Sequence, residues 1–213
     1  MLGRIRWEEG RRMRLAQERL WELPVLTVYL PERGRGQPRR LEKAARALAE
    51  RRVTRVLAPP DFPHWQALTR RGLQPVDTQA LRCALTPAWV RAALAARGIA
   101  PEKAVLSLAG ARESPDMERV AWALCPMVRN LIIDVPVGGG LAARLRREYG
   151  LPVLPVRSVQ ADLVLRFDPG PILAGAGYSL QGAELPRDCE ILPLLAALWE
   201  NGRVKTEEIS VQI

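Results

Sequence analysis

Aliphatic runs and amphipathic helical segments alternate along this chain, and a chain with that order has few folds open to it. Five short aliphatic or β-branched runs are typical of buried parallel strands, and they cover residues 25–30, 53–58, 104–108, 131–135 and 151–156. Helical periodicity or start and stop signals mark residues 41–48, 86–97, 114–124, 140–149 and 191–201. Parallel strands need crossover connections, usually helices. The order therefore predicts a Rossmann-like α/β fold with a mainly parallel sheet and helices on both faces.

The strand–helix–strand–helix order occurs twice, at an offset of about 76 residues. Under this alignment Glu42 matches Glu118, and Leu48 matches Leu124. An internal duplication of two βαβα halves is one interpretation, and the apolar rhythm shared by all such units is the other. After residue 160, apolar residues alternate with other residues in 163–167 and 209–213, a pattern that predicts half-covered strands at a sheet edge or in a hairpin.

These patterns divide the chain into three regions. Residues 1–23 are predicted to form a basic N-terminal helical segment, with Met13, Ala16 and Leu20 on one side. Residues 24–100 form the first βαβα half. Residues 101–213 form the second half with a C-terminal β-rich extension and helix. The two halves are expected in one compact domain or in two lobes.

Composition excludes several classes of protein. Of the 213 residues, 48% are hydrophobic and 26% are charged, as in globular rather than disordered chains. No apolar run is long enough to cross a membrane, and the N-terminus has no signal-peptide core, so we expect a cytoplasmic protein. Cys83, Cys125 and Cys189 form no CxxC pair, and His64 is the sole histidine, so no metal site is expected.

The positive charge is concentrated at the start of the chain. Residues 1–55 hold 15 basic and 7 acidic residues, a surplus of 8 out of the net charge of +9. Such a surface attracts phosphates, acidic proteins or anionic lipid. A compositional origin is the alternative, because only 3 of the 32 basic residues are lysine and an arginine bias often reflects a GC-rich bacterial genome.

The first candidate ligand site is the loop at 31–40, which connects a predicted strand to a predicted helix. Glycine allows close backbone approach, and a helix N-terminus offers free N–H groups to an anion. The candidate ligand-binding residues here are Arg33, Gly34, Arg35, Gly36 and Arg39. The third glycine of the dinucleotide fingerprint and the Lys-Ser/Thr of a P-loop are both missing. A solvated basic loop is therefore the competing interpretation.

The second candidate ligand site is the loop at 134–140, again between a strand and a helix. Gly138, Gly139 and Gly140 precede the helix and could form an anion-binding nest. Asp134 is well placed to bind a ribose hydroxyl or to act as a general base. The alternative is a glycine-rich turn in which backbone N–H groups satisfy Asp134.

Catalytic signals in the sequence are weak. Asp61 and His64 are candidates for an acid–base pair, although a lone histidine beside Trp65 is more often a packed side chain. Ser114 is explained as a helix N-cap before Pro115. There is no Gly-x-Ser-x-Gly elbow.

The sequence thus favours a protein that binds a small phosphate- or carboxylate-bearing ligand at its glycine-rich loops. One alternative is a nucleic-acid-associated or protein-interaction module that uses the basic N-terminal quarter. Another is a nucleotide or sugar-phosphate enzyme with Asp134 as acid or base. No motif requires a cofactor, and the sequence leaves the oligomeric state and the ligand's identity open.

Overall fold

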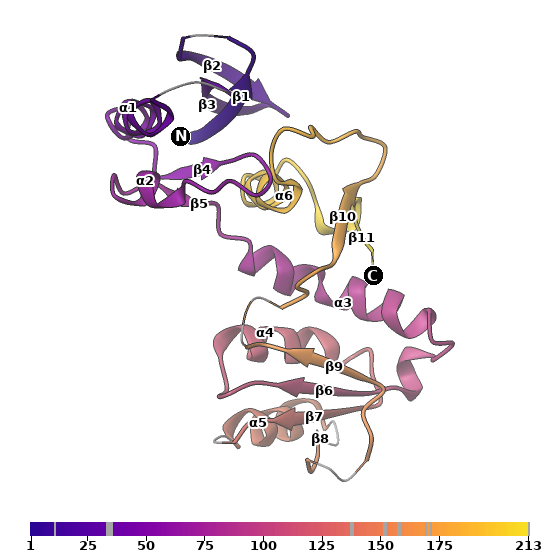
Figure 1. Cartoon of the computed structure of the whole chain (residues 1–213). Coiled ribbons are helices and arrows are strands. Elements are labelled where there is room, and N and C mark those ends of the chain that lie inside the picture. Colours follow the sequence, from indigo (N-terminus) through magenta and orange to yellow (C-terminus); the bar gives the residue numbers. More distant parts are fainter. Residues whose placement is uncertain are drawn as a thin grey trace. The chain divides into compact units, whose positions relative to one another are not determined.

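The chain forms two compact units, which Figure 1 shows in the computed structural model. The structure describes residues 1–10, 12–32, 36–136, 139–150, 153–156, 159–168, 170 and 172–212. The first unit comprises Met1–Thr78 and Leu180–Glu208, and the second comprises Gln79–Ser179 and Ile209–Ile213. The division differs from the predicted halves, because residues 1–23 are part of the first sheet and residues 180–208 return to the first unit.

The first unit is built on a five-stranded sheet with the order β2-β3-β1-β4-β5. All neighbours are parallel except β2 and β3. The strands are β1 (Leu2–Glu8), β2 (Arg14–Leu20), β3 (Leu23–Pro31), β4 (Arg55–Leu57) and β5 (Gln74–Pro75). The N-terminal strand β1 is central, between β3 and β4.

Helices cover both faces of this first sheet. Helices α1 (Gln37–Ala49) and α2 (Trp65–Thr69) contribute Leu41, Leu48 and Leu68 to a core that includes Ile5 and Val56. Arg55 precedes Val56 and therefore points to the opposite face. Glu200, at the end of α6 (Ile191–Glu200), pairs with Arg55, so α6 lies on that opposite face. A short 3-10 turn, η2 (Thr206–Glu208), follows α6.

The second unit contains a four-stranded sheet with the order β8-β7-β6-β9, and every pair in it is parallel. The strands are β6 (Val105–Ala109), β7 (Asn130–Asp134), β8 (Val153–Leu154) and β9 (Leu163–Arg166). The order 3-2-1-4 is that of the first four strands of a dinucleotide-binding sheet, with its switch point between β6 and β9. Strands β10 (Gly177–Leu180) and β11 (Ile209–Gln212) form a separate two-stranded sheet.

Helices α3 (Gln79–Ala95), α4 (Pro115–Leu124) and α5 (Gly140–Tyr149) share one core with the second sheet, and η1 (Pro101–Lys103) precedes β6. The sheet contributes Leu106, Leu108, Leu131 and Ile133 to this core, all from one face. In the described part of the unit no helix covers the other face, so the prediction of helices on both faces is wrong there. The cause is the connection from β8 to β9, whose described residues contain no helix.

The predicted strands and helices are largely confirmed. Each of the five aliphatic runs overlaps a strand, and these strands are β3, β4, β6, β7 and β8. The alternating segments near 163 and 209 form β9, at the edge of its sheet, and β11. Ser114 caps α4 as predicted, because its hydroxyl accepts a hydrogen bond from the backbone N–H of Met117 at 3.1 Å.

The prediction of an N-terminal helix is wrong, because residues 2–8 and 14–20 form strands. Ile5 and Trp7 alternate with Arg4 and Arg6, which is the period of a strand. The helix propensity of arginine and glutamate obscured that alternation, and pairing with β3 and β4 overrides propensity here.

The helix predicted over 86–97 begins earlier than predicted, because α3 starts at Gln79 and contains Thr86 and Pro87. Proline removes one helical N–H donor. The hydroxyl of Thr86 donates a hydrogen bond to the backbone carbonyl of Arg82 at 2.9 Å. Thr86 is therefore an interior residue of α3, bonded to the preceding turn of the helix.

The internal duplication is not confirmed. The matched strands β3 and β4 are separated by β1 in the first sheet, whereas β6 and β7 are direct neighbours in the second.

Candidate functional site

A groove in the first unit lies between α1 (Gln37–Ala49) and α2 (Trp65–Thr69), and it extends from the N-terminal ends of these helices to Arg70 at the end of α2. Its N-terminal end lies at the carboxyl ends of β3 and β4, where ligands bind in open α/β sheets. Strand β3 precedes α1 in the chain, and β4 is followed by residues 58–64 and then by α2. The two helices enclose a hollow of about 310 Å³. It is lined by Pro38, Arg39, Glu42, Pro63, His64, Gln66, Ala67, Arg70 and Arg71.

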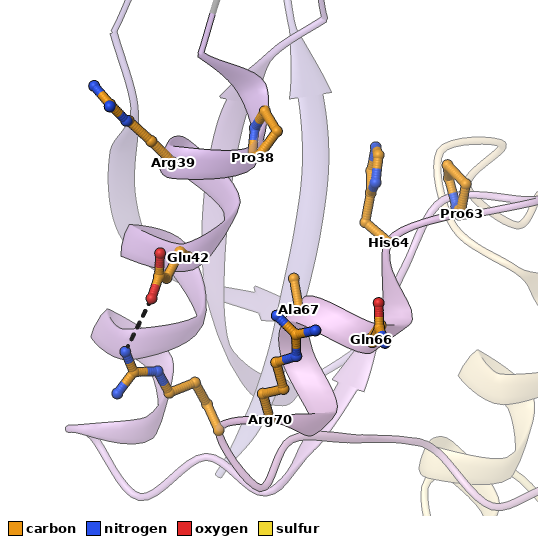
Figure 2. Close-up of a pocket in the computed structure, with 9 residues that line it drawn as sticks. Pro38, Arg39, Glu42, Pro63, His64, Gln66, Ala67 and Arg70 are labelled. Carbon is orange, nitrogen blue, oxygen red and sulfur yellow. Dashed lines mark hydrogen bonds and ion pairs between the residues drawn. The ribbon is translucent and has the colours of Figure 1, made fainter.

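The groove is rich in cations that the protein does not neutralise. Arg71 pairs with Glu42 at 3.2 Å, which accounts for the acidic group in the lining. Among the described residues, neither Arg39 nor Arg70 has an ion-pair partner. Figure 2 shows Arg70 rising into the space between α2 and α1, with His64 upright near Pro63, while Arg39 extends away from Arg70. Arg70 therefore presents an unpaired guanidinium group to the hollow, and Arg39 and His64 contribute to its lining.

The predicted loop at 31–40 contributes to this groove. Gly36 is the N-cap of α1 in a left-handed conformation (φ 86°), which glycine adopts readily, and it has no side chain with which to cap the helix. Arg39 lines the groove from the first turn of α1. Arg33, Gly34 and Arg35 lie outside the described residues.

The predicted loop at 134–140 is organised differently, because the protein's own carboxylate lies at the start of α5. Glu113 accepts hydrogen bonds from the backbone N–H groups of Gly139, at 2.8 Å, and Leu141, at 3.2 Å. Gly140 begins the helix beside this carboxylate, and Gly138 lies outside the described residues. The backbone N–H groups that were predicted to bind an external anion thus donate hydrogen bonds to the Glu113 carboxylate instead.

A similar carboxylate lies at the switch point of the second sheet. Asp168, two residues after β9, accepts a hydrogen bond from the backbone N–H of Ala111 at 2.5 Å. Asp134 is exposed at the end of β7 and does not share the contacts of Gly139.

Glu113→Ala should lower the free energy of unfolding by about 1 kcal/mol, because it removes the hydrogen bonds at the start of α5. Urea denaturation measures this loss, and exposed Glu102 supplies the matched control, Glu102→Ala. Sulfate should restore part of the stability of Glu113→Ala by occupying the vacated N–H groups. Equal stability of the two variants would contradict the capping role of Glu113.

Asp61 and His64 have separate surroundings. His64 packs edge-on against Phe62, with ring centroids 5.6 Å apart, and lines the groove. Asp61 is exposed, and its charge, together with the larger effect of burial, raises the pKa of Glu190. His64 therefore lines the groove, whereas Asp61 interacts with Glu190.

Sequence reasoning missed a polar network on the face of the first sheet opposite α1 and α2. Arg4 is buried and donates a hydrogen bond to Asp188 at 2.5 Å, and Arg6 forms an ion pair with the same carboxylate at 2.7 Å. The register places Arg4 beside Thr27, and Arg6 beside Tyr29. The alternation of arginine with apolar residues in 2–8 indicated that the arginines share one face of a strand. Asp188 is so distant in sequence that no local pattern identified it as their partner.

Glu18, on β2, completes this network. Thr27 donates a hydrogen bond to Glu18 at 2.8 Å, and Tyr29 donates another. Burial raises the pKa of the Glu18 carboxyl, but these hydrogen bonds and nearby Arg4 outweigh burial and hold the pKa below its ordinary value. Burial and the charge of Glu18 raise the pKa of Tyr29. The network therefore holds Glu18 ionised and Tyr29 protonated at neutral pH.

The three cysteines are buried, as predicted for Cys125. Burial raises the pKa of each thiol to about 11, so thiolate chemistry at neutral pH is suppressed. The described residues contain no group of histidine, cysteine and acidic side chains suited to a metal ion. No helix in the described part of the chain is both long and apolar enough to cross a membrane.

No known protein family matches this chain, and no curated protein matches it. A solved structure with some likeness is L-tryptophan dehydrogenase from Nostoc punctiforme, at a TM-score of 0.34 and 13% sequence identity. The likeness covers 67% of this chain and 44% of that enzyme, so the chain spans less than half of the enzyme's length. The α/β class of the two units rests on their own strand order and crossover helices.

Proposed function

We propose that the first unit is a binding domain for a small phosphate-bearing ligand, held in the groove between α1 and α2. The unpaired guanidinium of Arg70, which reaches into the groove, carries this proposal. Guanidinium groups match the geometry of phosphate oxygens and form charge-assisted hydrogen bonds with them. Arg39 and His64 add donors at the same hollow.

The start of α1 supports a phosphate in particular. No acidic residue lies in its first turn, and Gly36 provides no side-chain cap. By contrast, Ser114 caps α4 and Glu113 occupies the start of α5. The positive end of the α1 dipole is therefore the one of these three left open to an anion. A hollow of about 310 Å³ suits a ligand the size of a mononucleotide or a sugar phosphate.

Two other functions have less support. Arg4, Arg6, Arg14 and Arg19, four of the 15 basic residues in 1–55, each pair with a carboxylate, so part of the charge of the basic N-terminal quarter is neutralised within the protein. This weakens the case for nucleic-acid binding. For an enzyme, the described residues provide no hydrogen-bond partner that would position the Asp134 carboxylate as acid or base.

Arg70→Gln should weaken binding of AMP or ribose 5-phosphate about tenfold, which is the loss of one charge-assisted hydrogen bond at a partly exposed site. Isothermal titration calorimetry on the full chain measures this loss. Adenosine and ribose, which lack the phosphate, should bind far more weakly to the unchanged protein. Arg203→Gln is the matched control, because Arg203 is an exposed arginine of the first unit outside the groove.

The proposal fails if phosphate esters bind equally well to the unchanged protein and to Arg70→Gln. It also fails if neither ester binds at moderate salt. If inorganic phosphate binds as tightly as both esters, the groove binds the phosphate ion alone and does not recognise a specific small molecule.

A further inference from the structure

The second sheet has an open face, which carries a trough along its central strand. In β6, Leu106 and Leu108 face the helices, so Ser107 and Ala109 face the opposite way. The register places Ile132 and Val164 on either side of Ser107. Small residues on the central strand thus lie between larger residues on both neighbours, which makes the face concave.

The walls of the trough are apolar and partly exposed. Val156, Val159 and Ala161, from the connection between β8 and β9, border the hollow together with Ile132 and Val164. Val156, Val159 and Val164 are 44%, 45% and 44% exposed, and they are among the most exposed large apolar residues described. The hollow has a volume of about 320 Å³, at the lower end of the range for small-molecule sites.

Two opposite charges lie at the carboxyl end of the trough. Ala109 on β6 is paired with Asp134 on β7 and with Arg166 on β9. The two charged residues are therefore two strand spacings apart, roughly 10 Å between their Cα atoms. Neither side chain has an ion-pair or hydrogen-bond partner within the described part of the chain. They flank the switch point between β6 and β9, the usual ligand position in such a sheet.

We propose that this trough binds a zwitterionic ligand of the amino-acid class. The ammonium group faces Asp134, the carboxylate faces Arg166, and the hydrocarbon part lies over Ala109 among the valines. A ligand with one kind of charge would leave either Asp134 or Arg166 beside a like charge or without a counter-charge. A ligand with both charges satisfies the two side chains at once, and the apolar walls bury its side chain. Ser107 and Ala109, which form the floor of the trough, are small and therefore leave space for the ligand.

Calorimetric titration of the full chain with matched probes tests this proposal. L-leucine carries both charges, 4-methylpentanoate is leucine without its amine, and 3-methylbutylamine is leucine without its carboxylate. We expect leucine to bind at least about tenfold more tightly than either analogue, because each analogue loses one charge-assisted contact.

Two variants assign the contacts. Arg166→Gln should weaken leucine binding about tenfold and remove its advantage over 3-methylbutylamine, while Asp134→Asn should remove its advantage over 4-methylpentanoate. Arg129→Gln is the control, because Arg129 is exposed just before β7, at the opposite end of that strand from Asp134. Circular dichroism of each variant checks that the fold is intact.

The proposal is overturned if leucine does not bind, if its analogues bind as tightly, or if Arg166→Gln and Arg129→Gln behave alike. Its outcome is independent of the phosphate groove, because Arg70→Gln should leave leucine binding unchanged. Arg70→Gln therefore tests the phosphate groove, and Arg166→Gln tests the trough independently.

Discussion

Asp188→Ala is expected to lower the free energy of unfolding by about 3 kcal/mol, because it removes the ion-pair partner of the buried guanidinium of Arg4. The Arg4 side chain is 7% exposed and that of Asp188 is 30% exposed. The Nε atom of Arg4 is buried and already lacks a hydrogen-bond partner. Removing Asp188 would leave the guanidinium with little compensation inside the first unit, a situation far more costly than the loss of a surface ion pair.

A double variant separates buried charge from lost packing. In Arg4→Met with Asp188→Ala neither charge of this ion pair remains, so this protein should be more stable than Asp188→Ala alone. Glu22→Ala is the matched control, since the Arg19–Glu22 pair is exposed, and it should cost less than about 1 kcal/mol. Urea denaturation gives all three values. If Asp188→Ala and Glu22→Ala cost the same, the pair with Arg4 does not anchor the segment around Asp188 to the sheet.

The parts of the fold that were predictable from the sequence are those with local signals. Buried parallel strands are continuous aliphatic runs, and Ser114-Pro115 is a local cap, so both were read without knowledge of the tertiary structure. Strand order is a different matter. The central position of β1 depends on its pairing with both β3 and β4, and no local pattern in residues 2–8 specifies two neighbours.

The candidate groove was predictable only in part. A strand, a glycine and basic residues before a helix pointed to Gly36 and Arg39, and His64 was noticed as a lone histidine. Arg70 was missed because it lies at the end of α2, where an arginine is an ordinary surface residue in sequence. The occupation of the α5 N-terminus by Glu113 was also unpredictable, since 26 residues separate Glu113 from Gly139. Contacts of this length come from the assembled fold.

Gly3→Ala should destabilise the protein by about 2 kcal/mol, the second largest effect expected here. Gly3 is buried in β1, where helix α1 packs closely on the central strand. A Cβ at this position would lie 2.8 Å from Cγ1 of Val53, and 3.3 Å from side-chain atoms of Leu48 and Val56. These neighbours are themselves buried and close-packed, so they have little room to move. Thermal or urea denaturation measures the loss.

Gly10→Ala is the matched control, because a Cβ there meets no atom within 4 Å, and it should change stability by less than about 0.5 kcal/mol. Val53→Ala removes the methyl group that the new Cβ would approach most closely. The double variant Gly3→Ala with Val53→Ala should therefore be more stable than the sum of the single effects, by about 1 kcal/mol. Additive effects would mean that Gly3 is required for something other than the close approach of Val53 to β1. Equal stability of Gly3→Ala and Gly10→Ala would contradict the packing of β1 at the centre of the first sheet, because an exposed N-terminal helix would accept alanine at both positions.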